Sequence, residues 1–93
     1  MEFEWDDQKE KANIAKHGIS FEEATSVFDY PVYETVDTRV DYGETRYTGI
    51  GRNQRFVILT VVYTERGDAI RIISARRATK QEKRLYYDYC AQT

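Results

Sequence analysis

Three arginines at the end of one apolar stretch are the side chains in this sequence best suited to chemistry on an anion. Residues 70–75 are typical of a buried strand, because isoleucine occupies positions 70, 72 and 73. Arg71 lies in this strand, and Arg76 and Arg77 follow where the strand leads into a helix. With a side-chain period of two, we expect Arg71 and Arg77 on one face and Arg76 on the other. Guanidinium groups held this rigidly match phosphate oxygens, so the strand end is predicted to bind a phosphodiester.

The helix that follows these arginines is predicted to begin at Thr79 or the next residue and to end near residue 89. Thr79 suits the N-cap, and Glu82 three residues later completes a capping box. The helix carries a tyrosine cluster, namely Tyr86, Tyr87 and Tyr89. Aromatic faces bind unstacked nucleobases, and a phenol can supply a proton. The alternative is that one or two tyrosines bury the helix face together with Leu85 and Cys90.

The single histidine, His17, is a candidate for general acid–base chemistry. We expect it at the end of a helix over residues 7–16, which Asp6 caps and which Gly18 terminates in a left-handed conformation. An imidazole there can act as a general base. Equally, Lys16 and His17 can serve as cations that complement the negative end of the helix dipole. The sequence leaves both roles of His17 open.

The rest of the chain positions these groups through a regular series of helix and strand signals. Ser20 and Glu23 form a second capping box, and Gly49 and Gly51 indicate a bulge or a close approach of another backbone. The helices are expected over residues 7–16, 21–28 and from 79 or 80 to 89. A short strand is expected around residues 3–5, and further strands over residues 32–36, 45–52, 56–64 and 69–75. The connections are a polar loop over residues 37–44 and turns at residues 52–55 and 65–68.

This order predicts an α+β fold. It consists of a short N-terminal strand, two helices, a twisted antiparallel sheet of three to four strands and a C-terminal helix. We expect the helices on one face of the sheet and the opposite face to remain partly open.

The composition indicates one folded domain that spans residues 1–93, with 41% hydrophobic and 14% aromatic residues. No apolar run approaches the length of a membrane span, and the acidic N-terminus is unlike a signal peptide. One cysteine and one histidine favour a reducing cytoplasm and argue against a zinc site.

The net charge of −2 hides an asymmetry between the two halves of the chain. Residues 1–48 hold 12 acidic and 5 basic residues, a net of −7, whereas residues 49–93 hold 4 acidic and 9 basic residues, a net of +5. A basic stripe on an acidic protein can dock a polyanion, because the local field governs the encounter. The alternative is that the two halves neutralise each other within the fold.

Motifs in both halves of the chain occur in one characteristic order. The first half carries Trp5-Asp6, Lys16-His17-Gly18-Ile19, Phe21-Glu22-Glu23-Ala24 and Val27-Phe28. The second half carries Gly43-Glu44-x-Arg46, Gly51, Val61-Val62-Tyr63-Thr64, Arg66-Gly67, Ile70-Arg71-Ile72-Ile73-Ser74-Ala75-Arg76, and Glu82 with Tyr86. In this combination the chain resembles the BrnT family of toxins from bacterial type II toxin–antitoxin pairs.

The resemblance covers nearly the whole chain and implies a RelE-like fold and a ribonuclease activity that inhibits translation. It also implies neutralisation by a cognate BrnA antitoxin with a DNA-binding ribbon-helix-helix part, so that operator DNA is reached only through the antitoxin. Neither a metal nor another cofactor is implied. The positions that match the family are Lys16, His17, Arg71, Arg76, Glu82 and Tyr86.

RNA can be cut without a metal when the ribose 2′-hydroxyl attacks the adjacent phosphate, which requires a base, an acid and cations. We therefore expect the catalytic residues to be His17, Arg71, Arg76 and Tyr86. The expected RNA-binding residues are Lys16, Arg52, Arg77 and Lys80. The two arginines expected to be catalytic also have competing roles. Arg76 can form an ion pair with Glu82, and Arg71 can pair with an acid on a neighbouring strand.

The rival function is a non-catalytic module that binds protein or nucleic acid in a repressor complex. In this interpretation the basic half docks an acidic segment of a partner, and no bond is cleaved. Cleavage of RNA in the presence of EDTA distinguishes the enzyme from this module.

Overall fold

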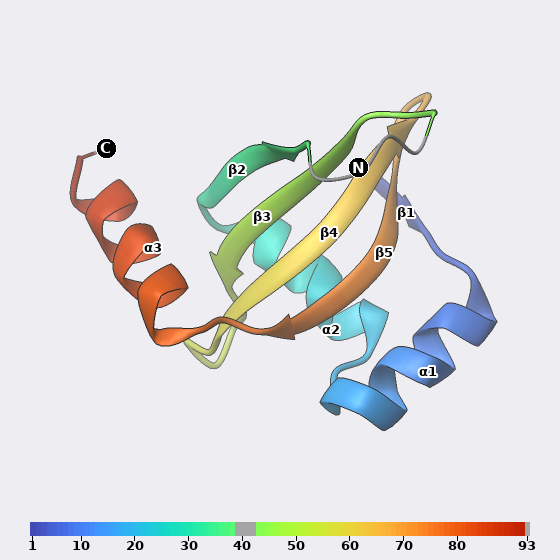
Figure 1. Ribbon diagram of the computed structural model, residues 1–93, viewed down its shortest axis with the longest axis horizontal. Coiled ribbons are helices and arrows are strands. Elements are labelled where there is room, and N and C mark those ends of the chain that lie inside the picture. Colours follow the sequence, from blue (N-terminus) through green and yellow to red (C-terminus); the bar gives the residue numbers. More distant parts are fainter. Residues whose placement is uncertain (39–42, 93) are drawn as a thin grey trace.

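The chain folds around a five-stranded sheet with the strand order β1-β5-β4-β3-β2 (Figure 1). The strands are β1 (Glu2–Glu4), β2 (Val32–Asp37), β3 (Arg46–Arg52), β4 (Ile58–Arg66) and β5 (Ala69–Arg77). Strands β2 to β5 form the expected antiparallel sheet, and β1 adds a parallel edge strand beside β5. This computed structural model, which describes residues 1–38 and 43–92, is therefore an α+β fold as predicted.

The helical elements are α1 (Asp7–His17), α2 (Phe21–Thr25), the 3-10 turn η1 (Ser26–Asp29) and α3 (Lys80–Gln92). The predicted helix over residues 21–28 is thus a short α-helix that continues as a tighter 3-10 turn. Of the loop predicted over residues 37–44, residues 39–42 lie outside the described residues. None of the helices in the described ranges has the length and apolar character that crossing a membrane requires.

The predicted caps at both ends of α1 and the predicted N-cap of α2 are confirmed. The Asp6 carboxylate accepts the Lys9 backbone N–H at 3.0 Å, and the Ser20 hydroxyl accepts that of Glu23 at the same distance. Gly18 ends α1 in the left-handed region with φ 71°, a conformation that glycine adopts without a Cβ penalty. The chain therefore turns sharply between α1, which lies against β5, and α2, which packs on one face of the sheet.

The two faces of the sheet are covered by different helices. The main core lies between the sheet and the segment that runs from Ile19 through α2 and η1, and its buried members are Ile19, Phe21, Ala24, Val27, Leu59, Val61, Tyr63, Ile72 and Ala75. The prediction that all helices share this face is wrong for α3, because Tyr86 packs with Ile50 and Ile58 on the opposite face. We call this opposite face the open face, since α3 covers it mainly near β2 and β3. Figure 1 shows α2 behind the sheet and α3 beside it.

A β-bulge determines which way the arginines of β5 point. The register between β4 and β5 shifts by one residue in the middle of β5. Arg71 consequently lies opposite Thr64 in β4, and Arg76 lies opposite Thr60. These threonines are four residues apart and alternate with core residues, so both face away from the core. The expectation for the faces is therefore wrong: Arg71 and Arg76 share the open face, and Arg77 lies on the other.

The glycines of β3 were expected to mark a bulge or the close approach of another backbone, but at Gly49 side chains make the close approach. A Cβ added there would lie 2.8 Å from Val32 Cγ1 and 2.9 Å from Tyr63 Cε1. Tyr63 is 1% exposed, and its hydroxyl donates a hydrogen bond to Glu34 on the edge strand β2. Burial raises the pKa of the Tyr63 phenol far above its usual range. Gly49 thus gives β2 and a core tyrosine the space to meet.

Candidate functional site

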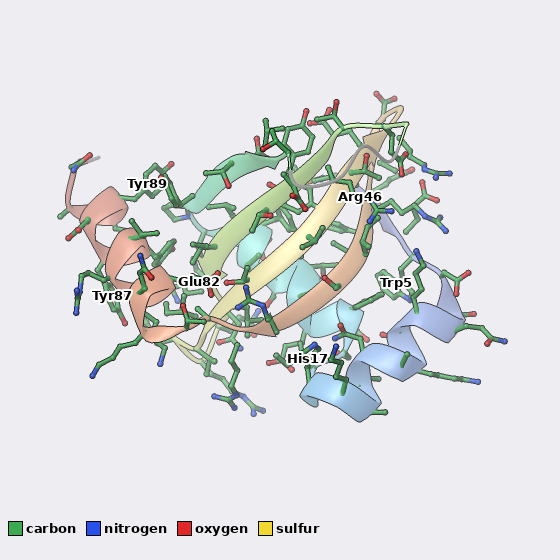
Figure 2. All side chains as sticks on the ribbon, in the orientation of Figure 1. Trp5, His17, Arg46, Glu82, Tyr87 and Tyr89 are labelled. Carbon is green, nitrogen blue, oxygen red and sulfur yellow. The ribbon has the colours of Figure 1, made fainter. Side chains whose placement is uncertain are left out.

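The Arg76 guanidinium lies on the open face and is held by the Glu82 carboxylate from the first turn of α3. Arg76 Nη1 donates to Glu82 Oε1 at 2.7 Å, and Nη2 donates to Oε2 at 2.9 Å. Glu82 Oε1 also accepts from the Thr60 hydroxyl at 3.0 Å and from the Thr79 backbone N–H at 2.8 Å. The capping box is confirmed, because the Glu82 N–H in turn donates to the Thr79 hydroxyl. One carboxylate therefore connects β4, β5 and α3 (Figure 2).

Hydrogen bonds from Arg76 hold the pKa of Glu82 at about 2, well below its usual value of 4.5. The carboxylate is therefore ionised at neutral pH and fixes the plane of the guanidinium. The Arg76 side chain nevertheless remains 41% exposed. The ion-pair role that the sequence left open is thus present, and it orients a cation that solvent and ligands can still reach.

Arg71 lies on the same face but reaches in another direction. Its guanidinium contacts the Glu4 carboxylate on β1 at 2.9 Å, and its side chain is 26% exposed. The opposing threonines on β4 place Arg71 about 13 Å along the strand from Arg76, at roughly 3.3 Å per residue. The structure therefore does not bring the two guanidiniums together on one phosphate.

His17 and Lys16 lie at the end of α1 beside a shallow hollow of about 260 Å³. The hollow is lined by Lys9, Ala12, Asn13, Lys16, His17, Ile73 and Ser74. No arginine belongs to its lining, so the imidazole and the guanidiniums do not share it. Ser74, which lies opposite Val62, is two residues before Arg76 on the open face. Ser74 also belongs to the lining of the His17 hollow.

A buried asparagine that sequence reasoning missed holds α1 in this position. Asn13 is 7% exposed, and its Nδ2 donates to the carbonyl oxygens of Ile19 at 2.9 Å and Ala75 at 2.8 Å. Its Oδ1 accepts the Ala75 N–H at 3.1 Å. The side chain thus satisfies both backbone groups of Ala75, much as a neighbouring strand would. The sequence did carry a signal for this buried role, namely an asparagine on a helix with few apolar residues.

Tyr86 is placed for packing more than for contact with a substrate. It is 3% exposed, and its hydroxyl donates to the Pro31 carbonyl at 2.8 Å. Burial raises the pKa of this phenol to about 12. Tyr89 packs against Tyr33 of β2, with ring centroids 5.3 Å apart, whereas Tyr87 is 59% exposed. The packing alternative for the cluster is therefore favoured for two tyrosines, but Leu85, which is 43% exposed, takes no buried place.

The remaining basic residues of the prediction gather at one end of the sheet. Arg52 is the last residue of β3, and its guanidinium lies 3.5 Å from the Tyr30 ring centroid and 4.2 Å from that of Phe56. Arg77 and Lys80 are exposed on either side of the junction between β5 and α3. This junction lies against the start of β4, since the Ala78 N–H donates to the Ile58 carbonyl at 3.0 Å. Within residues 1–38 and 43–92, no group of three or more His, Cys, Asp and Glu side chains is placed to hold a metal ion.

Comparisons with known proteins agree with the arrangement of these elements. The family described as "Ribonuclease toxin, BrnT, of type II toxin-antitoxin system" matches residues 5–82. A solved structure, the crystal structure of the Brucella abortus ribonuclease toxin BrnT, is similar to the chain with 30% sequence identity and a TM-score of 0.64. The similarity covers 86% of this chain and 99% of the Brucella chain. A search of curated proteins returned no match.

Proposed function

We propose, from the premise that the chain belongs to the BrnT family of ribonuclease toxins of type II toxin–antitoxin systems, that it is a metal-independent endoribonuclease. It acts in the cytoplasm, where cleavage of RNA inhibits translation. Its partner is a BrnA-type antitoxin with a ribbon-helix-helix part, and operator DNA is reached only through that antitoxin.

The observation that carries the proposal is the oriented guanidinium of Arg76 on the open face. Cleavage of a phosphodiester passes through a crowded, doubly charged phosphate, and a planar donor pair stabilises this charge well. Because Glu82 already fixes the guanidinium, little rotamer entropy remains to be lost when a phosphate binds. The exposed part of the side chain is where a phosphate approaches.

His17 is the proposed general base. The ribose 2′-oxygen gives its proton to the imidazole and forms a bond to phosphorus, while the bond from phosphorus to the 5′-oxygen breaks. The 5′-oxygen leaves with a proton from solvent, and the products are a 2′,3′-cyclic phosphate and a 5′-hydroxyl. Ser74 lines the hollow of His17 and comes two residues before Arg76 on β5, so in this proposal the RNA crosses Ser74 to reach both side chains.

Other basic residues have supporting roles in this proposal. Arg71 lies too far along the strand to share a phosphate with Arg76, so it binds a neighbouring phosphate of the same RNA. Lys16 contacts the backbone beside His17, and Arg52, Arg77 and Lys80 extend the contact beyond Arg76. Because Tyr86 is buried and hydrogen-bonded, the proposal assigns it no proton transfer.

Incubation of the purified protein with single-stranded RNA in EDTA tests this activity. We expect cleavage products that end in a cyclic phosphate, and no cleavage where a 2′-O-methyl group replaces the attacking hydroxyl. His17→Ala is expected to reduce the rate by about 100-fold or more, the usual contribution of a general base.

Arg76 requires a control because removing it leaves Glu82 without its ion-pair partner. The double variant Arg76→Gln with Glu82→Gln removes both charges and keeps two amides that can hydrogen-bond. We expect this double variant to fold and to lose cleavage. The variant Arg76→Lys, by contrast, keeps the positive charge but loses the planar pair of donors. If His17→Ala and the double variant both cut RNA at the wild-type rate, the site is wrong. Binding without cleavage by the wild-type protein would support the rival module.

A further inference from the structure

An exposed aromatic ring stands at the turn between β3 and β4, in a backbone conformation that phenylalanine rarely adopts. Phe56 has φ 63°, and it is the residue other than glycine with positive φ in the described part of the chain. Its side chain is 73% exposed. A left-handed backbone and the exposure of a large apolar ring are both unfavourable for folding alone. A ring held outward in this way points to a ligand.

The turn is built to keep Phe56 in this conformation. Asn53, which is 4% exposed, accepts the backbone N–H groups of Arg55 at 2.8 Å and Val57 at 3.0 Å through its Oδ1. Its carbonyl accepts the Phe56 N–H at 3.1 Å. The Asn53 amide is itself fixed by Glu23 at 3.1 Å. The residues before, at and after the ring are therefore all bound to one buried asparagine.

A guanidinium supports one face of the Phe56 ring. Arg52 lies between the rings of Tyr30 and Phe56, at 3.5 Å and 4.2 Å from their centroids. A cation on one face of an aromatic ring limits the ring's motion and leaves the other face for a second planar group. The arrangement is a short stack that ends in an accessible ring.

The charges around this stack select the kind of ligand. The turn at residues 52–57 and the adjoining junction at residues 76–80 contain five basic residues and no acid. These residues are Arg52, Arg55, Arg76, Arg77 and Lys80. Two of the nearby acids are already bound, since Glu82 pairs with Arg76 and Glu23 accepts from the Asn53 amide. Glu22 and Glu23 lie on the α2 side, where they line a hollow of about 420 Å³. A negatively charged ligand with a planar group is thus favoured on the side that faces Arg76.

We propose that Phe56 is a stacking platform for an unpaired base of single-stranded RNA, in a segment that flanks the phosphate at Arg76. Arg55, Arg77 and Lys80 neutralise the backbone of this segment, and the base stacks on the accessible face of the ring. The inference rests on the proposed ribonuclease function and adds to it a subsite beside the scissile phosphate. A protein partner is less suited to the site, because the surface is dominated by basic groups around one ring.

The test uses a 2′-O-methyl oligoribonucleotide that contains 2-aminopurine, so that binding is measured without cleavage. Stacking quenches 2-aminopurine fluorescence, and we expect the wild-type protein to quench it. Phe56→Ala is expected to lose the quenching and to weaken binding by about 5- to 150-fold, the range for loss of one base stack. Phe56→Trp is expected to keep both.

Phe56→Gly separates this role from folding. Glycine removes the ring like alanine but adopts φ 63° without strain, so we expect Phe56→Gly to melt at a higher temperature than Phe56→Ala and to bind equally weakly. If Phe56→Ala binds and quenches like the wild-type protein, the platform does not exist. If it keeps RNA binding but loses its complex with the antitoxin, Phe56 belongs to a protein interface and the proposal is overturned.

The outcomes for the platform and for the enzyme are separate. RNA cleavage by the wild-type protein with no effect of Phe56→Ala would refute the platform alone. Quenching by the wild-type protein without any cleavage would refute the ribonuclease alone.

Discussion

Replacement of Asn13 by alanine is expected to release α1 from the edge of β5. The substitution removes three hydrogen bonds, two to Ala75 and one to the Ile19 carbonyl. At a net contribution of about 0.5–1.5 kcal/mol each, these bonds stabilise the fold by about 1.5–4.5 kcal/mol. Alanine returns about 0.5 kcal/mol of helix propensity, so we expect a loss of about 1–4 kcal/mol.

Chemical denaturation with urea measures this loss, and the melting temperature should fall by on the order of 10–20 °C for a domain of this size. Ile14→Ala on the same helix is the matched control, because that side chain is 45% exposed. We expect this control to cost less than about 1 kcal/mol. Amide hydrogen exchange at Ala75 should accelerate in Asn13→Ala and not in Ile14→Ala.

Asn13→Asp adds a charge test at the same position. A carboxylate can still accept the Ala75 N–H, but it faces the carbonyl oxygens of Ile19 and Ala75 that the amide contacts. At neutral pH this variant should therefore be less stable than Asn13→Ala. If Asn13→Ala unfolds within about 0.5 kcal/mol of the wild-type protein, within the range of a neutral surface change, Asn13 does not anchor α1.

Two further predictions concern the acid on α3 and a glycine of β3. Because the pKa of Glu82 is lowered from 4.5 to about 2, its stabilising effect is fully present above pH 4.5 and is lost as the pH falls to about 2. The shift corresponds to about 3 kcal/mol at most, and solvent screening reduces this to about 1–2 kcal/mol. In urea denaturation, the stability difference between the wild-type protein and Glu82→Gln should therefore shrink over this pH range, and a constant difference would contradict the role of the ion pair. Gly49→Ala should destabilise the protein by about 1–3 kcal/mol by overpacking, since its Cβ would meet Val32 and the buried Tyr63. If Gly49→Ala leaves the urea midpoint unchanged, the edge strand β2 moves aside freely.

Local signals in the sequence predicted the elements well where a few neighbouring residues determine them. The capping residues Asp6, Ser20 and Thr79 and the terminating Gly18 lie where the structure has helix ends. Each of these signals depends on hydrogen bonds within three or four residues, which is why spacing alone reveals it.

Features that depend on distant parts of the chain could not be predicted in this way. The bulge in β5 reverses the faces expected for its arginines, and nothing in the local alternation marks its position. The bond between Asn13 and Ala75 joins residues 62 positions apart. The family resemblance supplied the ribonuclease class, and the structure then placed His17 beside a hollow that no arginine lines, with Arg76 on the open face.

The dependence of α1 on β5 has a consequence during synthesis. The strand that receives Asn13 and carries Arg76 is the last of the sheet to leave the ribosome, and β1 also pairs with it. A nascent chain that ends before this strand therefore has neither an anchored first helix nor the guanidinium of the proposed centre. The surface that carries the proposed centre is therefore finished only after residues 69–77 have been made and have paired with β4 and β1.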